Sequence, residues 1–160
     1  MSNYLIDDNF IKNTLSSART IAMIGVSSFK KEKSANTIRK PSIIVMNYLL
    51  EFGFNVIPVN PNAVGKKING QKVVASLQDI IDSIDIVNVF RPSKEAHEIA
   101  KETIKIKAKV FWLQFGIHNE EAKKTVESKN IAYISNKCIK QEYQRLFLKV
   151  NPVFPALLNK

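Results

Sequence analysis

The chain has 160 residues, 45% of them hydrophobic, and 24 Lys and Arg against 14 Asp and Glu give it a formal net charge of +10. This length is enough to bury a core and too short for two ordinary domains, so we expect one domain with a core over about 14–147 and a tail over 151–160. The apolar runs are too short to cross a membrane, the acidic start is unlike a signal peptide, and a single cysteine excludes an internal disulfide. We therefore expect a cytoplasmic protein whose charge favours anionic partners.

Short apolar runs alternate along the chain with segments of helical periodicity. In chain order these patterns predict strand 21–24, helix 41–52, strand 54–59, a small hairpin or bent loop over 66–74, a helix opened by Ser76, strand 84–90, helix 94–106, strand 109–113, a helix from Asn119 to Lys129, strand 131–134 and a short helix from Cys138 toward Phe147. Pro41 suits a first helical position and Gly53 suits a helix end. Pro58 favours an irregular or edge-like end for its strand.

Strands that alternate with helices require a parallel sheet with helices on both faces. We therefore expect an α/β protein, a single Rossmann-like domain whose five-stranded, mainly parallel sheet has the order 3-2-1-4-5. In that order strand 21–24 lies beside strand 109–113. Because ligands of such sheets bind beyond the carboxyl ends of the strands where the order reverses, the site is expected between these two strands.

The first strand end carries a turn that suits phosphate better than a dinucleotide. Gly25 is the only one of the three fingerprint glycines present, and Asn60-Pro61 stand where NAD proteins carry a ribose-binding carboxylate. The segment Gly25-Val26-Ser27-Ser28 offers backbone N–H groups and two hydroxyls to a phosphate, and the basic patch 30–40 follows it. A purely structural turn is the alternative interpretation.

Two further strand ends carry candidate binding groups. Phe90-Arg91 offers a ring that could stack on a purine and a guanidinium that could pair with a phosphate, although Arg91 in a structural ion pair is the alternative. Gln114 and Gly116 offer an amide and a bare backbone, or simply form a turn.

Catalytic groups do not converge in the sequence. His97 lies in a predicted helix and His118 in a loop, without the spacing of a metal site or a triad, so each is interpreted as an ordinary surface or core histidine. Cys138 is a candidate redox site at a helix start, with a buried structural cysteine as the alternative. We therefore expect no catalytic or metal site, and a ligand-binding protein rather than an enzyme.

Several segments, taken in order, form a recognisable set: 19–27, 40–50, 56–61, 89–91, 112–117 and Cys138 to Glu142. The set resembles the small bacterial coenzyme A-binding proteins, which are related to the CoA-binding Rossmann domain of the succinyl-CoA synthetase alpha subunit. The resemblance implies that CoA or an acyl-CoA lies over the strand ends. The candidate binding residues are Gly25, Val26, Ser27, Ser28, Lys30, Ser42, Asn60, Pro61, Phe90, Arg91, Gln114, Phe115, Gly116 and Ile117.

Two features depart from the family pattern. The loop 28–40 is longer and more basic than the usual connection, and Tyr143 stands where the family commonly carries histidine. The phosphorylated histidine of the synthetase belongs to a domain that this chain does not have, so succinyl-CoA synthesis is not inferred.

Two other functions stay open. The sheet alone is compatible with an NAD(P)-binding oxidoreductase-type domain. The net charge and the patch 30–40 are compatible with a basic module that binds nucleic acid or protein. The sequence decides neither the oligomeric state nor the choice among free CoA, an acyl-CoA and another adenine nucleotide.

Overall fold

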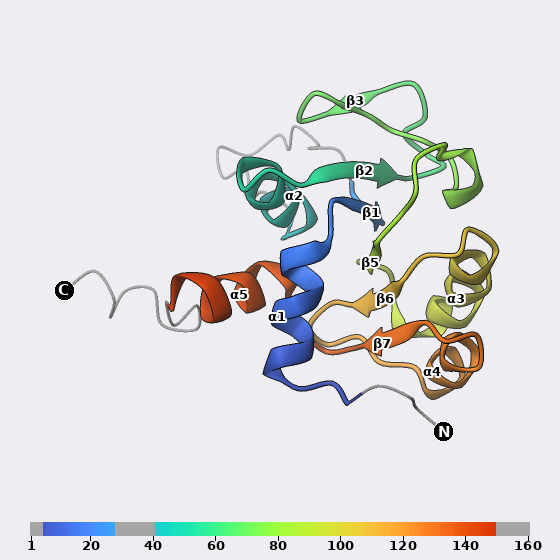
Figure 1. The fold of residues 1–160 in the computed structure, drawn as a ribbon. Coiled ribbons are helices and arrows are strands. Elements are labelled where there is room, and N and C mark those ends of the chain that lie inside the picture. The colour runs from blue at the N-terminus through green and yellow to red at the C-terminus, as the bar shows by residue number, and fades with distance from the viewer. Residues whose placement is uncertain (1–4, 28–40, 150–160) are drawn as a thin grey trace.

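A computed structural model of the protein describes residues 5–27 and 41–149 (Figure 1). Five parallel strands form one sheet in the order β2-β1-β5-β6-β7. The strands are β1 (Thr20–Ile24), β2 (Asn55–Val59), β5 (Ile86–Val89), β6 (Val110–Leu113) and β7 (Ala132–Ile134), and a separate hairpin pairs β3 (Lys67–Ile68) with β4 (Gln71–Lys72). This confirms the predicted α/β class, the five-stranded parallel sheet and the hairpin.

Helices cover both faces of the sheet, as Figure 1 shows. The α-helices are α1 (Asp8–Ser17), α2 (Pro41–Glu51), α3 (Ala96–Lys105), α4 (Glu120–Glu127) and α5 (Ile139–Tyr143). α1, α2 and α5 pack on one face around Met23, Met46 and Trp112, whereas α3 and α4 pack on the other around Val87 and Phe111. Because both faces are buried, the strands are continuous apolar runs rather than alternating ones.

The predicted strand order 3-2-1-4-5 is wrong, since the third strand of the sheet, β5, lies on the other side of β1 from β2. Pro58 supplies a physical reason. Its carbonyl faces outward and accepts the Val74 N–H at 3.1 Å, so its ring nitrogen, which has no hydrogen, also faces the outer side. Only one bridge, Val59 to Val74, forms there. A strand as apolar as β5, buried at every residue, fits the central position instead.

The order places the reversal between β1 and β5, not between β1 and β6 as predicted. β1 and β5 flank this point, and the helices that follow them in the described part of the chain, α2 and α3, pack on opposite faces of the sheet. The expected location of the site therefore shifts by one strand.

The helices differ from the predictions at four places. The segment after Ser76 makes only a single 3₁₀ turn, Leu77–Asp79, in which the Asp79 carboxylate accepts the Ser76 N–H at 3.1 Å. α3 is preceded by a 3₁₀ turn, Ser93–Glu95, and α5 continues into a π-helical turn, Gln144–Leu148. α1 was not predicted. Within the described residues, no helix combines the length and apolar content that a membrane span requires.

The ends of α1 and α2 follow from local sequence. The Asp7 carboxylate accepts the Phe10 N–H at 2.8 Å and so caps α1, which buries Ile11 and Leu15 one turn apart. α2 stops at Gly53, whose φ is +92°, as the predicted helix end requires. The predicted tail 151–160 and the basic patch 30–40 lie outside the described residues.

Candidate functional site

The turn after β1 depends on Gly25. Its φ is +91°, and a Cβ there would lie 3.0 Å from the Phe90 carbonyl oxygen and 2.9 Å from the Cδ of Arg91. The Gly25 N–H donates to the Val59 carbonyl at 3.2 Å, and the Phe90 N–H donates to the Ile24 carbonyl at 2.8 Å. The carboxyl ends of β2, β1 and β5 are therefore tied together at a point where only glycine fits.

Asn60 holds the same turn from the end of β2. Its Nδ2 donates to the Val26 carbonyl at 2.9 Å, and its Oδ1 accepts the Asn62 N–H at 2.9 Å. The Asn60 backbone N–H donates to the Val74 carbonyl at 2.9 Å. Asn60 thus fixes two loops at the position where an NAD-binding protein carries a carboxylate for the ribose.

Arg91 follows β5 and pairs with the first turn of the segment that leads into α3. Its Nη2 lies 2.9 Å from Glu95 Oε2, and its Nε donates to Glu95 Oε1 at 3.2 Å. The two side chains are 47% and 37% exposed, so water weakens the pair. The structural ion pair considered for Arg91 is present, yet the guanidinium stays accessible to a stronger anion.

A cavity of about 410 Å³ lies at the order reversal, beyond the ends of β2, β1 and β5. Its volume is within the range of small-molecule sites. Five of the predicted residues line it, namely Gly25, Ser27, Asn60, Pro61 and Arg91. The structure thus brings together residues that are separated by up to 66 positions, and the 3₁₀ turn after Ser76 and α3 form the remaining wall.

Other predicted residues lie outside this cavity. Val26 and Ser42 are buried, and Phe90 packs partly against the core on the α2 face. Gln114 is also buried and donates from Nε2 to Asn88 Oδ1. Ser28 and Lys30 lie outside the described residues.

The loop after β6 lies at the same end of the sheet as the cavity, beyond the carboxyl ends of the strands. Phe115 is 75% exposed, and the Gly116 N–H donates to Asn136 Oδ1 at 2.7 Å. Ile117 packs partly against the core on the α3 face. None of these three side chains or backbones lines the strand-end cavity, so their predicted role in binding stays a prediction.

His118 has partners that the sequence did not reveal. Its Nε2 lies 3.1 Å from Glu120 Oε1, and its Nδ1 lies 3.1 Å from Ser135 Oγ and 3.2 Å from Tyr133 Oη. His118 follows β6 and Ser135 follows the neighbouring strand β7. Their positions after two predicted strands were the one feature of the sequence that could have indicated that they lie close together. The cluster brings a hydroxyl, an imidazole and a carboxylate together beside β7.

The remaining singled-out residues have structural roles. His97 lies 3.2 Å from Thr125 Oγ1 and 3.3 Å from Glu121 Oε2, and so links α3 to α4. Cys138 packs partly against the core before α5. Among the described residues, no three metal-ligating side chains of His, Cys, Asp or Glu gather at one point.

Tyr143, where the family commonly has histidine, lies in an aromatic cluster between α2 and α5. Its ring stacks on Phe147 at 4.6 Å between centroids and lies 5.0 Å from the ring of Phe52. Tyr48 and Phe54 flank it at 6.0 Å. The departure at this position therefore has a packing explanation.

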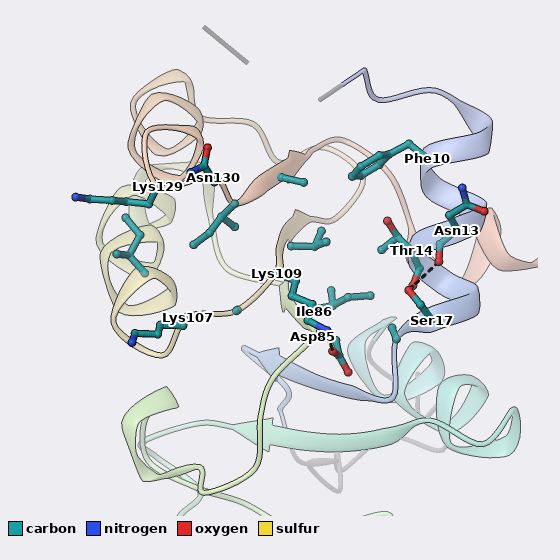
Figure 2. A pocket seen from close by; sticks show the side chains of 16 residues that line it. Phe10, Asn13, Thr14, Ser17, Asp85, Ile86, Lys107, Lys109, Lys129 and Asn130 are labelled. Atoms are coloured by element: carbon teal, nitrogen blue, oxygen red, sulfur yellow. Dashed lines mark hydrogen bonds and ion pairs between the residues drawn. The ribbon is translucent and has the colours of Figure 1, made fainter. Parts of the chain in front are cut away.

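A larger cavity, about 900 Å³, lies at the opposite, amino-terminal end of the sheet (Figure 2). It contains none of the predicted binding residues. Lys109 there pairs with Asp85 at 3.3 Å, and Figure 2 shows Lys107 and Lys129 extending away from its centre. Ligands of doubly wound sheets bind at the carboxyl end, so we do not place the binding site here.

The fold and the site define a Rossmann-like α/β domain with a cavity at the point where the strand order reverses. Residues 19–144 match the family described as CoA binding domain, and the chain belongs to this family. This confirms the resemblance found in the sequence.

Individual relatives agree with this assignment. The uncharacterized protein YneT of Bacillus subtilis (strain 168) is 35% identical over 130 residues, which cover 81% of this chain and 89% of that protein. The structure of a hypothetical protein from Pyrococcus horikoshii OT3 superposes with a TM-score of 0.77 at 33% identity, covering 91% of this chain and 99% of that one. A Thermus thermophilus structure gives a TM-score of 0.78 at 34% identity, covering 89% and 100%.

Proposed function

We propose that this protein binds coenzyme A or an acyl-CoA in the 410 Å³ cavity at the carboxyl ends of β2, β1 and β5. The observation that carries the proposal is that the CoA-binding family match, 19–144, includes every residue that lines the cavity. The convergence of five independently predicted residues on one cavity supports it.

The groups at the cavity suit a phosphorylated ligand. The glycine turn lets a ligand approach the backbone after β1, where a Cβ would collide with Phe90 and Arg91. The Ser27 hydroxyl donates hydrogen bonds, and the Arg91 guanidinium offers a two-point contact to a phosphate. The net charge of +10 favours a polyanion such as CoA over a neutral ligand.

The NAD(P) alternative has less support at this site. NAD recognition uses a carboxylate at the end of β2, and Asn60 stands there with its amide bound to the Val26 carbonyl. Neither histidine nor cysteine lines the cavity. We therefore assign the cavity to binding rather than to a reaction.

Ligand-induced stabilisation tests the proposal. At a ligand concentration of 100 times Kd, a bound ligand raises the free energy of unfolding by about 2.7 kcal/mol. A thermal scan with CoA, acetyl-CoA, dephospho-CoA, NAD and NADP should show the largest shift with one of the CoA species. A flat response to CoA at millimolar concentration, or a larger shift with NADP, would overturn the proposal.

A further inference from the structure

We propose that Ser135, His118 and Glu120 form a catalytic site that cleaves a short acyl thioester by acylation of Ser135. The choice of a CoA thioester as substrate rests on the proposed binding function. The choice of Ser135 as nucleophile rests on the geometry of the cluster alone.

Hydrogen-bonding logic fixes the tautomer of His118. A carboxylate oxygen accepts hydrogen bonds, so we assign the neutral imidazole the tautomer with hydrogen on Nε2, which then donates a hydrogen bond to Glu120 Oε1 at 3.1 Å. The Nδ1 lone pair then faces the Ser135 hydroxyl, also at 3.1 Å. A carboxylate, a base and a serine in this relation activate the serine hydroxyl. In the common arrangement Nδ1 faces the carboxylate and Nε2 faces the serine, whereas here the two ring nitrogens have exchanged these roles.

Tyr133 contacts the same ring nitrogen of His118 as Ser135 does. Its Oη accepts the Asn119 N–H at 2.9 Å and lies 3.2 Å from His118 Nδ1. Burial raises the pKa of the Tyr133 phenol, so the phenol stays neutral. The Tyr133 and Ser135 side chains also hydrogen-bond to each other, and a phenol O–H that points to Ser135 Oγ leaves the Nδ1 lone pair to the Ser135 hydroxyl. The ring of His118 is thus positioned by contacts from β7 and from the start of α4.

The backbone around the cluster is fixed as well. The His118 N–H donates to Ser93 Oγ at 3.1 Å. The Asn136 N–H donates to the Ile117 carbonyl at 3.0 Å, while Asn136 Oδ1 accepts the Gly116 N–H at 2.7 Å. The loops after β6 and β7 are therefore clamped together, which is the preorganisation that a catalytic pair requires.

A cavity of about 330 Å³ opens directly onto the cluster. His118, Ser135 and Tyr133 line it together with Lys123 and Lys137. Its size suits a short acyl group. Glu127 also lines the cavity, and Lys137 lies 3.8 Å from Glu142 Oε1. Lys123 and Lys137 supply the positive charge that could stabilise an oxyanion intermediate.

The cluster lies on the same edge of the sheet as the proposed CoA cavity. From β1 to β7 the sheet order β1-β5-β6-β7 makes three strand spacings, about 14 Å at ~4.8 Å each. The pantetheine arm of CoA is a long flexible chain that separates the nucleotide from the thioester. A CoA bound by its nucleotide near Gly25 would carry its acyl end across the loop 114–117 toward His118.

The reaction has two balanced steps. The Ser135 Oγ attacks the thioester carbonyl carbon while His118 Nδ1 takes the hydroxyl proton, the C–S bond breaks, and the proton passes to the thiolate to give free CoA. Water then attacks the acyl-serine ester, His118 takes its proton, and Ser135 leaves with that proton restored. The net products are a carboxylic acid and CoA.

Two substrates separate this inference from the CoA proposal. p-Nitrophenyl acetate reports on the nucleophile without any CoA contact, through nitrophenol release and an acetyl adduct located by peptide mass mapping. Acetyl-CoA reports on the full reaction through thiol release. We expect the adduct on Ser135, and at least tenfold slower release with both substrates in Ser135→Ala and His118→Asn.

His97→Asn is the matched control, because it removes a histidine whose partners are Thr125 and Glu121 rather than the members of the cluster, and it should keep the wild-type rate. An adduct on another residue, no adduct, or equal rates in wild type and Ser135→Ala would overturn the site. The adduct on the wild-type chain needs no variant to fold. An adduct on Ser135 without CoA binding would overturn only the proposed function, whereas CoA binding without an adduct would overturn only this inference.

Discussion

Arg91 and Glu95 form a two-point ion pair at the rim of the strand-end cavity, with 2.9 Å between Nη2 and Oε2 and 3.2 Å between Nε and Oε1. A phosphate bound in the cavity would compete with Glu95 for the same edge of the guanidinium. In the free protein, Glu95 therefore holds the Arg91 guanidinium, the main candidate for binding a phosphate, in a fixed orientation.

Arg91→Ala should weaken CoA binding by roughly 10- to 100-fold, the loss expected for a hydrogen bond to a charged group. Glu95→Gln should tighten binding, because the guanidinium loses its competitor. Calorimetric titration of both variants checks this. Lys129→Ala, which removes an equal charge at the opposite end of the sheet, should bind CoA like the wild type. Equal affinities in all three variants would remove Arg91 from the site.

Gly25→Ala should destabilise the fold by about 1–3 kcal/mol, since the added Cβ meets backbone at 3.0 Å in a left-handed conformation. It should also weaken CoA binding. Gly65→Ala is a matched control with a φ of +84° and no atom within 4 Å of the added Cβ, so it carries the conformational cost alone. Urea unfolding compares the two. A Gly65→Ala variant as unstable as Gly25→Ala would show that the contact with Phe90 and Arg91 costs nothing.

Gln114 was predicted to bind the ligand, but the structure buries it against Asn88. Gln114→Leu should lower the free energy of unfolding by about 1–3 kcal/mol, because Asn88 Oδ1 loses its donor in a buried site. The double variant Gln114→Leu with Asn88→Val should recover part of that loss. Chemical denaturation measures the cycle. Unchanged stability with lost CoA affinity would instead return Gln114 to the binding site.

Asp85 links the stability of the protein to pH. Burial alone would raise the pKa of this carboxyl, but the N–H groups of Thr20 and Arg19 and the ammonium of Lys109 outweigh burial and lower it. The folded-state pKa is therefore below the unfolded value, so the stabilisation is complete above about pH 4 and is lost as the pH falls through the folded value.

Asp85→Asn should cost about 1–2 kcal/mol at neutral pH, since the two N–H donors at 2.8 and 3.0 Å lose a charged acceptor. The variant should also show a shallower loss of stability below pH 4. Urea titrations at a series of pH values measure both effects. A wild-type acid dependence in the variant would argue against this role.

The local pattern of the sequence predicted most of the strands and the turn at Gly25, because each depends on residues that are close in the chain. The strand order was not predictable in the same way. It depends on whether the nitrogen of Pro58 faces a neighbouring strand or the outer edge, and this orientation is decided only in the assembled sheet. α1 was missed because, although Asp7 caps it, only Ile11 and Leu15 are buried among its 10 residues, so its apolar pattern is sparse.

The candidate site was predictable in part for the same reason. Asn60 and Arg91 could be placed by the rule that strand ends gather at one edge of the sheet. The partners of His118 could not, because Ser135 reaches it only through the pairing of β6 with β7.

Isothermal titration of the purified protein with CoA, repeated in the presence of an equal concentration of NADP and accompanied by a titration with NADP alone, tests the central claim most directly. The account predicts saturable binding of CoA that NADP at the same concentration leaves nearly unchanged. Absence of heat with CoA, or selective binding of NADP, would contradict it.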